Sequence, residues 1–118
     1  MANDFKRICT PSIGTSLTTI YAVPAGPASA ALESIVIGIT MANKTTSGVT
    51  ADIFIDNEDG SNDVYIVKDA SIPAGSSLEV MSGNKLVLMN DGTNADNLEA
   101  TCSATSSLDV TVSVLEDV

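Results

Sequence analysis

The stretch SLDVTVSVLE, residues 107–116, decides the fold, because its apolar and polar side chains alternate. One set of alternate positions is apolar and comprises Leu108, Val110, Val112 and Val114. The positions between them are polar and comprise Asp109, Thr111 and Ser113. A period of two places the two sets on opposite faces of an extended chain. The stretch therefore predicts a β-strand with one face in a core and the other in water.

Two further runs alternate in the same way. The first is NLEATCSA, residues 97–104, where Cys102 shares the apolar phase and is expected to be a small core residue. The connection TSS, residues 105–107, is short enough to close a hairpin between this run and the strand that follows it. The second run is VTADIFI, residues 49–55. The sequence thus predicts three strands, two of them joined as a hairpin.

Two other runs are apolar on both phases: SIVIGITM, residues 34–41, and KLVLM, residues 85–89. Such strands are covered on both faces, either at the centre of a sandwich or in a contact between subunits. The remaining strands are expected at residues 16–23, 63–69 and 77–81. Turn residues separate the segments, and no window has the apolar spacing of an amphipathic helix. The strand set therefore numbers about eight.

The same turn tripeptide occurs twice, in VPAG at residues 23–26 and in IPAG at residues 72–75. Proline presets φ at the second position of a tight turn and glycine suits the fourth, so each copy ends a strand and redirects the chain. We expect each corner to carry the chain from one sheet to the other. A Leu-Glu pair follows each corner, and the repeat fits either two similar halves of four strands or chance reuse of a common turn.

These segments predict an all-β fold: a single β-sandwich of about eight antiparallel strands in two sheets, with a jelly-roll-like or immunoglobulin-like topology. The length of 118 residues is that of one domain. Residues 16–118 are assigned to the sandwich. Residues 1–15 are assigned to an N-terminal arm, because Pro11 and Gly14 interrupt a strand. One acidic and two basic residues give this arm a net charge of +1, and the total of −10 leaves −11 for the rest.

Charge and composition limit the classes of function. Fifteen acidic residues face five basic ones, and phosphate contacts need clustered Lys and Arg, so no nucleic-acid partner is expected. The chain lacks histidine, the usual base of a hydrolase, and tryptophan, a common platform for sugars. We therefore expect a protein that is not an enzyme, with no catalytic residues and no cofactor. No apolar stretch has the length of a membrane helix or a signal peptide, so we expect no membrane contact and synthesis in a cytosol.

Two acidic turns invite comparison with calcium sites. The loop DNEDGSND, residues 56–63, gathers the carboxylates of Asp56, Glu58, Asp59 and Asp63. Its glycine is the fifth loop residue, whereas an EF-hand needs glycine at the sixth. The turn NDGTNADN, residues 90–97, places Asp91 and Asp96 beside a second Asp-Gly pair. We predict solvated Asp-Gly turns and no metal site at either place, with calcium in the first loop as the alternative.

The N-terminal arm holds the candidate partner-binding residues, which are Phe5, Lys6, Arg7 and Ile8. The two apolar side chains supply anchors, and the two basic ones form an adjacent pair in an acidic chain. An extended segment can add its main chain to the edge of a neighbouring sheet while its basic side chains meet an acidic surface. We therefore expect the arm to dock on an adjacent protomer or on the surface of a larger assembly, with a frayed terminus as the alternative.

The segments VPAG, IPAGSSLEVMSGNKLVLMNDG and LEATCSATSSLDVTVSVLE resemble a group of small virion structural proteins of tailed bacteriophages, particularly phages of marine bacteria and cyanobacteria. In that group a Pro-Ala-Gly corner leads to Ser-Leu-Glu-Val and Lys-Leu-Val-Leu strands, an acidic turn and a closing Ser-Leu-Asp-Val strand. The likeness begins at Leu17 and leaves residues 1–15 outside it. The turn at residues 90–97 is longer than the compact acidic turn of the group.

The resemblance implies a non-enzymatic building block of a virion, assembled in the host cytoplasm. The expected function is that of a capsid decoration (cement) protein, which stabilises the head shell. Its expected partners are copies of itself, with a trimer favoured, and the major capsid protein or other virion proteins. Two alternatives stay open. One is a tail, neck or fibre component with the same fold, and the other is a carbohydrate- or cell-surface-binding module that uses calcium at Asp56, Glu58 and Asp59.

Overall fold

The computed structural model describes residues 3–56, 63–81 and 85–117. Within these ranges the strands are β1 Asn3–Ile13, β2 Thr18–Ala22, β3 Leu32–Asn43, β4 Val49–Asp56, β5 Asp63–Ile72, β6 Ser77–Glu79, β7 Leu86–Asn90, β8 Asn97–Cys102 and β9 Leu108–Asp117. One short 3₁₀ turn, η1 at Pro27–Ser29, precedes β3. In this described part of the chain, no helix has the length and apolarity that crossing a membrane would require.

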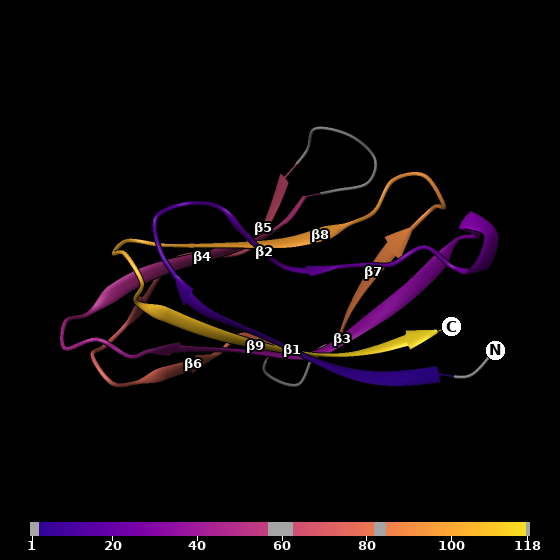
Figure 1. Ribbon diagram of the computed structural model, residues 1–118. Coiled ribbons are helices and arrows are strands. Elements are labelled where there is room, and N and C mark those ends of the chain that lie inside the picture. Colours follow the sequence, from indigo (N-terminus) through magenta and orange to yellow (C-terminus); the bar gives the residue numbers. More distant parts are fainter. Residues whose placement is uncertain (1–2, 57–62, 82–84, 118) are drawn as a thin grey trace.

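The strands form two antiparallel sheets that face each other across the core (Figure 1). The larger sheet has the order β1-β9-β3-β6, and β7 also pairs with β3. The strands β6 and β7 lie end to end along β3, since β7 pairs with residues 32–36 and β6 with residues 40–42. The smaller sheet has the order β2-β8-β4-β5. The prediction of an all-β sandwich with two antiparallel sheets is confirmed.

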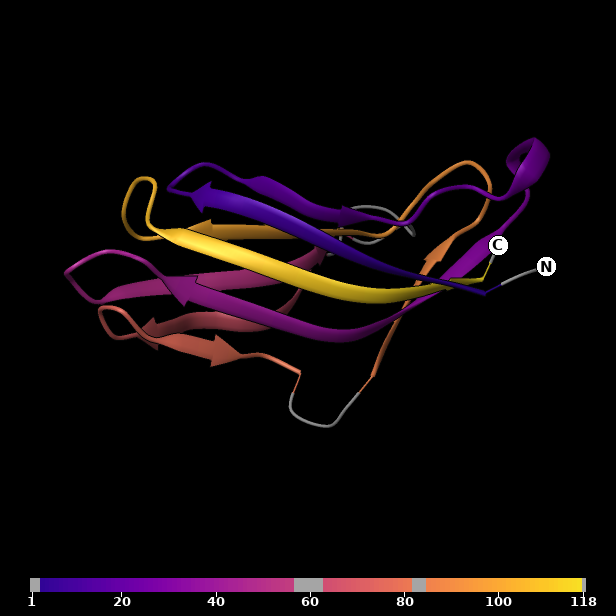
Figure 2. The same cartoon turned by 60° about the horizontal axis from the view of Figure 1, so that its bottom comes forward.

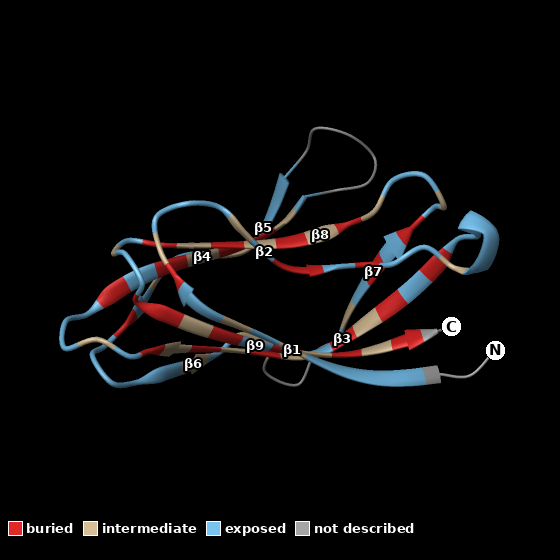
Figure 3. Ribbon diagram, in the orientation of Figure 1, coloured by how far each residue is buried: buried red, intermediate tan, exposed pale blue. Residues whose placement is uncertain are grey.

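The alternation in β9 supplies the centre of the core. Its apolar set is fully buried, with at most 1% exposure at each of Leu108, Val110, Val112 and Val114. Ile53 and Leu98, buried in the smaller sheet, belong to the same hydrophobic cluster. Figure 3 shows that strands of both sheets carry buried positions. Full burial of an aliphatic side chain of this size contributes about 1.5 to 3 kcal/mol. Cys102 is also buried, as its phase predicted.

The hairpin expected between residues 97–104 and 107–116 is wrong, because β8 and β9 belong to different sheets. Each strand already has a neighbour on both edges, β2 and β4 for β8 and β1 and β3 for β9, so neither has an edge left for the other. The residues that connect β8 and β9 make main-chain hydrogen bonds to both sheets. Ser103 N–H donates to Thr50 O at 2.9 Å in the smaller sheet, and Ser107 N–H donates to Ile13 O at 3.1 Å in the larger one.

The segment assigned to a separate arm lies within the sandwich, because Asn3–Ile13 form the edge strand β1. β1 pairs with β9 from its start to Thr10, and after an irregularity the pairing resumes at Ile13. Pro11 falls in this irregularity, where an edge strand tolerates a residue without an N–H group. Ser12 has a φ of +57° there, and its N–H donates to Asp109 Oδ1 at 2.9 Å. Residue 16 is therefore not the start of the domain.

Both Pro-Ala-Gly corners carry the chain from the smaller to the larger sheet, as expected, but their turns differ. In the second corner, Ser76 N–H donates to Pro73 O at 3.1 Å, and Gly75 has a φ of +68°. Glycine is thus the third residue of that turn and not the fourth. In the first corner, Gly26 has a φ of −72° and its N–H donates to Ala30 O at 2.8 Å. The two halves of four strands, β2 to β5 and β6 to β9, are not equivalent either. The last two strands of the first half, β4 and β5, share a sheet, whereas the last two of the second half, β8 and β9, do not.

Candidate assembly interface

β1 carries the four candidate partner-binding residues, and the strand alternation divides them into two pairs. Phe5 and Arg7 lie on the outer face of the larger sheet, and Phe5 is 73% exposed. Lys6 and Ile8 lie on the opposite face, where Ile8 is half-buried and packs against the core. Phe5 and Arg7 therefore point outward from the sheet, whereas Lys6 is 49% exposed with its ammonium against Glu116, and the role of all four residues in binding a partner stays a prediction.

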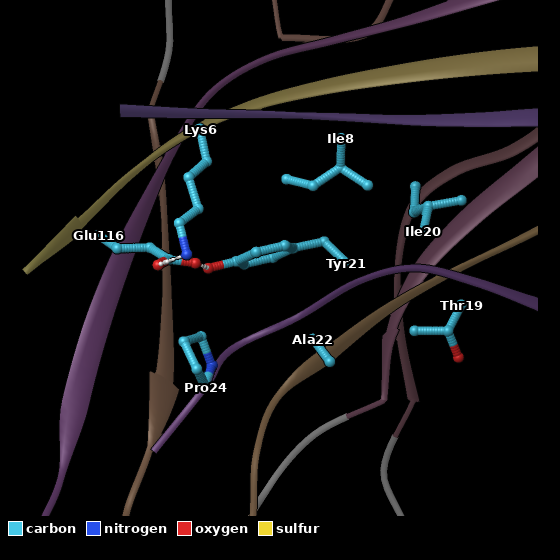
Figure 4. Close-up of a pocket in the computed structure, with 8 residues that line it drawn as sticks. All are labelled: Lys6, Ile8, Thr19, Ile20, Tyr21, Ala22, Pro24 and Glu116. Atoms are coloured by element: carbon cyan, nitrogen blue, oxygen red, sulfur yellow. Dashed lines mark hydrogen bonds and ion pairs between the residues drawn. The ribbon is translucent and has the colours of Figure 1, made fainter. Parts of the chain in front are cut away.

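A buried polar cluster ties β1 to both sheets (Figure 4). Its centre is Glu116 of β9, which is 2% exposed. Tyr21 of β2 donates its hydroxyl hydrogen to Glu116 Oε2 at 2.6 Å, and the same hydroxyl lies 2.8 Å from Ser34 Oγ of β3. Lys6 Nζ lies 3.0 Å from Glu116 Oε1, a buried atom that accepts no well-aligned hydrogen bond from the described residues. The ion pair with Lys6 thus offsets the cost of burying the charge on this oxygen.

Burial and the Glu116 carboxylate set the protonation of the cluster. Burial, and then the hydrogen bond to Glu116, raise the pKa of the Tyr21 phenol, so this group stays a hydrogen-bond donor at neutral pH. The polar contact with Glu116, and then the attraction of its charge, raise the pKa of the Lys6 ammonium. Both carboxylate oxygens of Glu116 face groups of the protein itself. The cluster therefore acts as a brace between the two sheets.

A cleft of about 410 Å³ opens beside this brace, between the sheet edges formed by β1 and β2 (Figure 4). Its walls are mainly apolar and include Ile8, Ile20, Ala22 and Pro24. The charged groups at the cleft are Lys6 and Glu116, which neutralise each other. The cleft is thus suited to an apolar side chain and offers little to a charged ligand.

The outer edge of β1 has two features that oppose the addition of another strand. Lys6 points a charge inward from an edge strand, and Pro11 with its neighbouring irregularity interrupts the pairing pattern. Both devices protect sheet edges against pairing with other chains. Contact with a partner through β1 is therefore better served by the outward side chains Phe5 and Arg7 than by main-chain pairing, which the sequence had favoured.

Tyr21, Ser34 and Glu116 were not predicted as a cluster from the sequence. A signal for Glu116 was present, since it continues the buried phase of Leu108 and Val110 along β9. A carboxylate in that phase must find a charge or hydrogen-bond partner inside the protein. The partner Tyr21 lies 95 positions away in the chain, so no local pattern identifies it.

The acidic loop at residues 56–63 lies mostly outside the described residues, and this includes Glu58 and Asp59. Asp56 and Asp63, which flank it, are opposite each other at the end of the β4–β5 ladder. Among the residues that the structure describes, no group of three or more His, Cys, Asp or Glu side chains is placed to hold a metal ion. The absence of a calcium site in this loop stays a prediction.

The carboxylates of the turn at residues 90–97 are engaged by the turn itself. Asp91 Oδ1 accepts the N–H groups of Thr93 and Asn94 at 2.8 and 2.7 Å, and these bonds lower the pKa of Asp91. Asp96 Oδ2 accepts the N–H group of Met89 at 2.9 Å and thereby ties the turn to β7. Both carboxylates have a structural role in this turn.

No family model and no curated protein sequence matches the chain. Among solved structures, one match is to the Bacillus endospore appendages, described as a novel family of disulfide-linked pili, with a TM-score of 0.42, 13% identity, and coverage of 97% of this chain and 86% of that one. Another is to infectious bursal disease virus, Gx strain, with a TM-score of 0.43, 13% identity, and coverage of 98% of this chain and 37% of that one. This chain thus spans little more than a third of the viral chain. Similarity at this level establishes neither a common family nor a common role.

Proposed function

We propose that the chain is a non-enzymatic structural protein of a phage virion, and specifically a decoration protein of the head shell. The observation that carries the proposal is the place of the phage-like segments in the fold. These segments form both Pro-Ala-Gly corners and the strands β6 to β9. β8 and β9 are central strands of the two sheets, so the resemblance lies in the part of the chain that determines the sandwich.

The buried cluster supports a structural role. A catalytic acid or base has to present an oxygen to a substrate. Glu116 instead directs one oxygen to Tyr21 and the other to Lys6, and it is buried. Its contacts join the strand β1 to β2 of the other sheet and to β9. Such a brace resists separation of the sheets, which is useful in a module that is held under load on a particle.

The charge distribution supports display in many copies. The net charge of −10 on 118 residues opposes non-specific aggregation of neighbouring copies at high local concentration. Arg7 adds an exposed basic group on the outer face of β1, where it can meet an acidic patch of another virion protein. A tail, neck or fibre component would share these properties, and the number of copies per particle separates the two roles.

Quantitative mass spectrometry of purified phage particles tests the proposal. A decoration protein is present on the order of hundreds of copies per particle, because it follows the symmetry of the head lattice. A tail or neck component is present at roughly a dozen or two copies, because it follows the symmetry of the tail axis. Absence of the chain from particles that are free of cell debris would contradict both roles.

A further inference from the structure

An apolar row crosses the outer face of the larger sheet. Register pairs Phe5 of β1 with Leu115 of β9, Leu115 with Ile35 of β3, and Ile35 with Val87 of β7. Residues paired directly across neighbouring strands point to the same face of a sheet. These four residues, here called the outer row, thus form one continuous line across four strands. Figure 2 turns this sheet forward and shows β1 in indigo, β9 in yellow and β3 in purple side by side.

The outer row is exposed at its two ends in the single chain, and its middle residues Leu115 and Ile35 are half-buried. Phe5 is 73% exposed and Val87 is 56% exposed, while Met89 and Ile37 beside the row are 46% and 40% exposed. An antiparallel sheet with one solvated face normally places polar side chains there. The two runs that are apolar on both phases, residues 34–41 and 85–89, are the source of this face. Their inner phase fills the core, so their outer phase remains to be covered by a subunit contact.

Charges of opposite sign flank the outer row. On the side nearer the chain termini, the exposed Glu33 of β3 precedes Ile35 by two residues and therefore lies in the next row on the same face. It pairs with Met89 of β7. On the other side, Arg7 of β1 is exposed, and so is Lys85, which precedes β7 in the same phase as Val87. Along the strands the face therefore has an acidic row at Glu33, the outer row, and a basic row at Arg7 and Lys85. The carboxylate of Glu79 reaches the middle of the basic row, 3.9 Å from the position that a Cβ on Gly38 would occupy, so the basic excess of that row is small.

This order is self-complementary. A two-fold axis that runs along the outer row stacks it on the outer row of a second copy and reverses the strand direction. The acidic row of each copy then lies over the basic row of the other, and Lys85 of the second copy comes nearest to Glu33. A two-fold axis along the strands would instead stack basic on basic and acidic on acidic. Charge complementarity thus favours the first arrangement.

We propose that two copies of this chain associate through the outer face of the larger sheet, with a two-fold axis along the outer row. Four strands at about 4.8 Å spacing, over the outer row and one row on each side of it, give a face of roughly 300 Å² per copy. The total of about 600 Å² is below the size of a standard specific interface, so we expect a weak dimer with a dissociation constant of about 100 µM. The inference goes beyond the virion role and does not depend on it.

Sedimentation velocity of the purified full chain, over concentrations from about 1 to 500 µM, measures the association. We expect Val87→Asp to weaken the dimer at least tenfold, because it buries two carboxylates in the stacked outer rows. Leu17→Asp is the matched control, since Leu17 is exposed but lies outside the sheet, between β1 and β2. It adds the same charge and should leave the dimer unchanged. Circular dichroism should show that both variants keep the fold of the parent chain.

A charge exchange tests the direction of the axis. Glu33→Lys alone and Lys85→Glu alone should each weaken the dimer several-fold, and the double variant should return to within about twofold of the parent, because the pair is restored with its signs exchanged. Failure of the double variant to recover would overturn the arrangement. A parent chain that stays monomeric over the whole concentration range would overturn the proposal. A monomer that binds phage particles through Val87 would also overturn it, since the face would then contact another virion protein.

Neither result changes the number of copies per particle. The virion proposal is therefore tested independently of the dimer.

Discussion

Tyr21→Phe removes one buried oxygen atom from the brace between the sheets and leaves the aromatic ring in place. The lost hydroxyl donates to Glu116 Oε2 at 2.6 Å and lies 2.8 Å from Ser34 Oγ. After the change, Glu116 is still buried and still paired with Lys6, but Oε2 has lost its donor. The variant therefore measures the cost of removing the hydrogen bonds of the Tyr21 hydroxyl to one oxygen of the buried Glu116 carboxylate and to the buried Ser34 hydroxyl.

The expected loss of unfolding free energy is about 2 to 3 kcal/mol. A hydrogen bond to a charged group contributes about 1.5 to 3 kcal/mol, and burial of the acceptor places this one near the upper end. The loss is a large part of the roughly 5 to 15 kcal/mol by which domains are stable. For a domain of this length it corresponds to a fall in melting temperature of about 8 to 12 °C.

Urea denaturation followed by circular dichroism measures the difference in unfolding free energy. Tyr65→Phe is the matched control, because Tyr65 is half exposed and its ring contacts with Phe54 and Lys68 survive the change. It should alter the free energy by no more than about 0.5 kcal/mol. A loss below about 0.5 kcal/mol for Tyr21→Phe would refute the reasoning, since it would mean that water replaces the phenol at Glu116.

The remaining predictions concern the core, pH, secondary structure and metal. Val112→Asp should prevent folding because the site is fully buried, whereas Thr111→Asp on the exposed face should be tolerated, and soluble yield with circular dichroism distinguishes them. The pKa values of Tyr21 and Lys6 are higher in the folded state than in the unfolded state. Their contribution to the free energy of unfolding is therefore complete below the unfolded-state pKa values, about 10 to 10.4, and is lost as pH rises through the folded-state pKa values. Denaturation curves from pH 8 upward should show this decline, and Tyr21→Phe should reduce it. The circular dichroism spectrum should be dominated by β-structure, with helix below roughly a tenth. Calorimetric titration should detect no calcium binding at residues 56–63 tighter than about millimolar, and micromolar binding would contradict this.

The strand phases were predictable because a period of two is a local property of the chain. Val110 and Val112 were assigned to the core and Thr111 to the surface from their order alone, and the structure confirms all three. Pairing was not predictable to the same extent. A short polar connection such as residues 103–107 fits a hairpin as well as a crossing between sheets, and only the neighbours available to β8 and β9 decide between them.

The N-terminal strand was missed for a different reason. Pro11 and Gly14 indicate interruption, and an edge strand tolerates an interruption that a central strand would not. The role of Lys6 depends on Glu116, which lies more than a hundred residues away in the chain and directly beside it in space. The sequence marked Lys6 as a basic residue for a partner. The structure pairs its ammonium with Glu116 of the same domain while the side chain stays 49% exposed, so its role toward a partner stays a prediction.

A cryo-electron microscopy map of the intact phage particle tests the central claim most directly, since it asks where the chain lies. The account predicts that the two-sheet sandwich, with β1 as an edge strand of the larger sheet, fits density on the outside of the head and repeats with the symmetry of the capsid lattice. Density for the sandwich in the tail alone would contradict the decoration role, and a particle without it would contradict the claim that the chain is a structural protein of the virion.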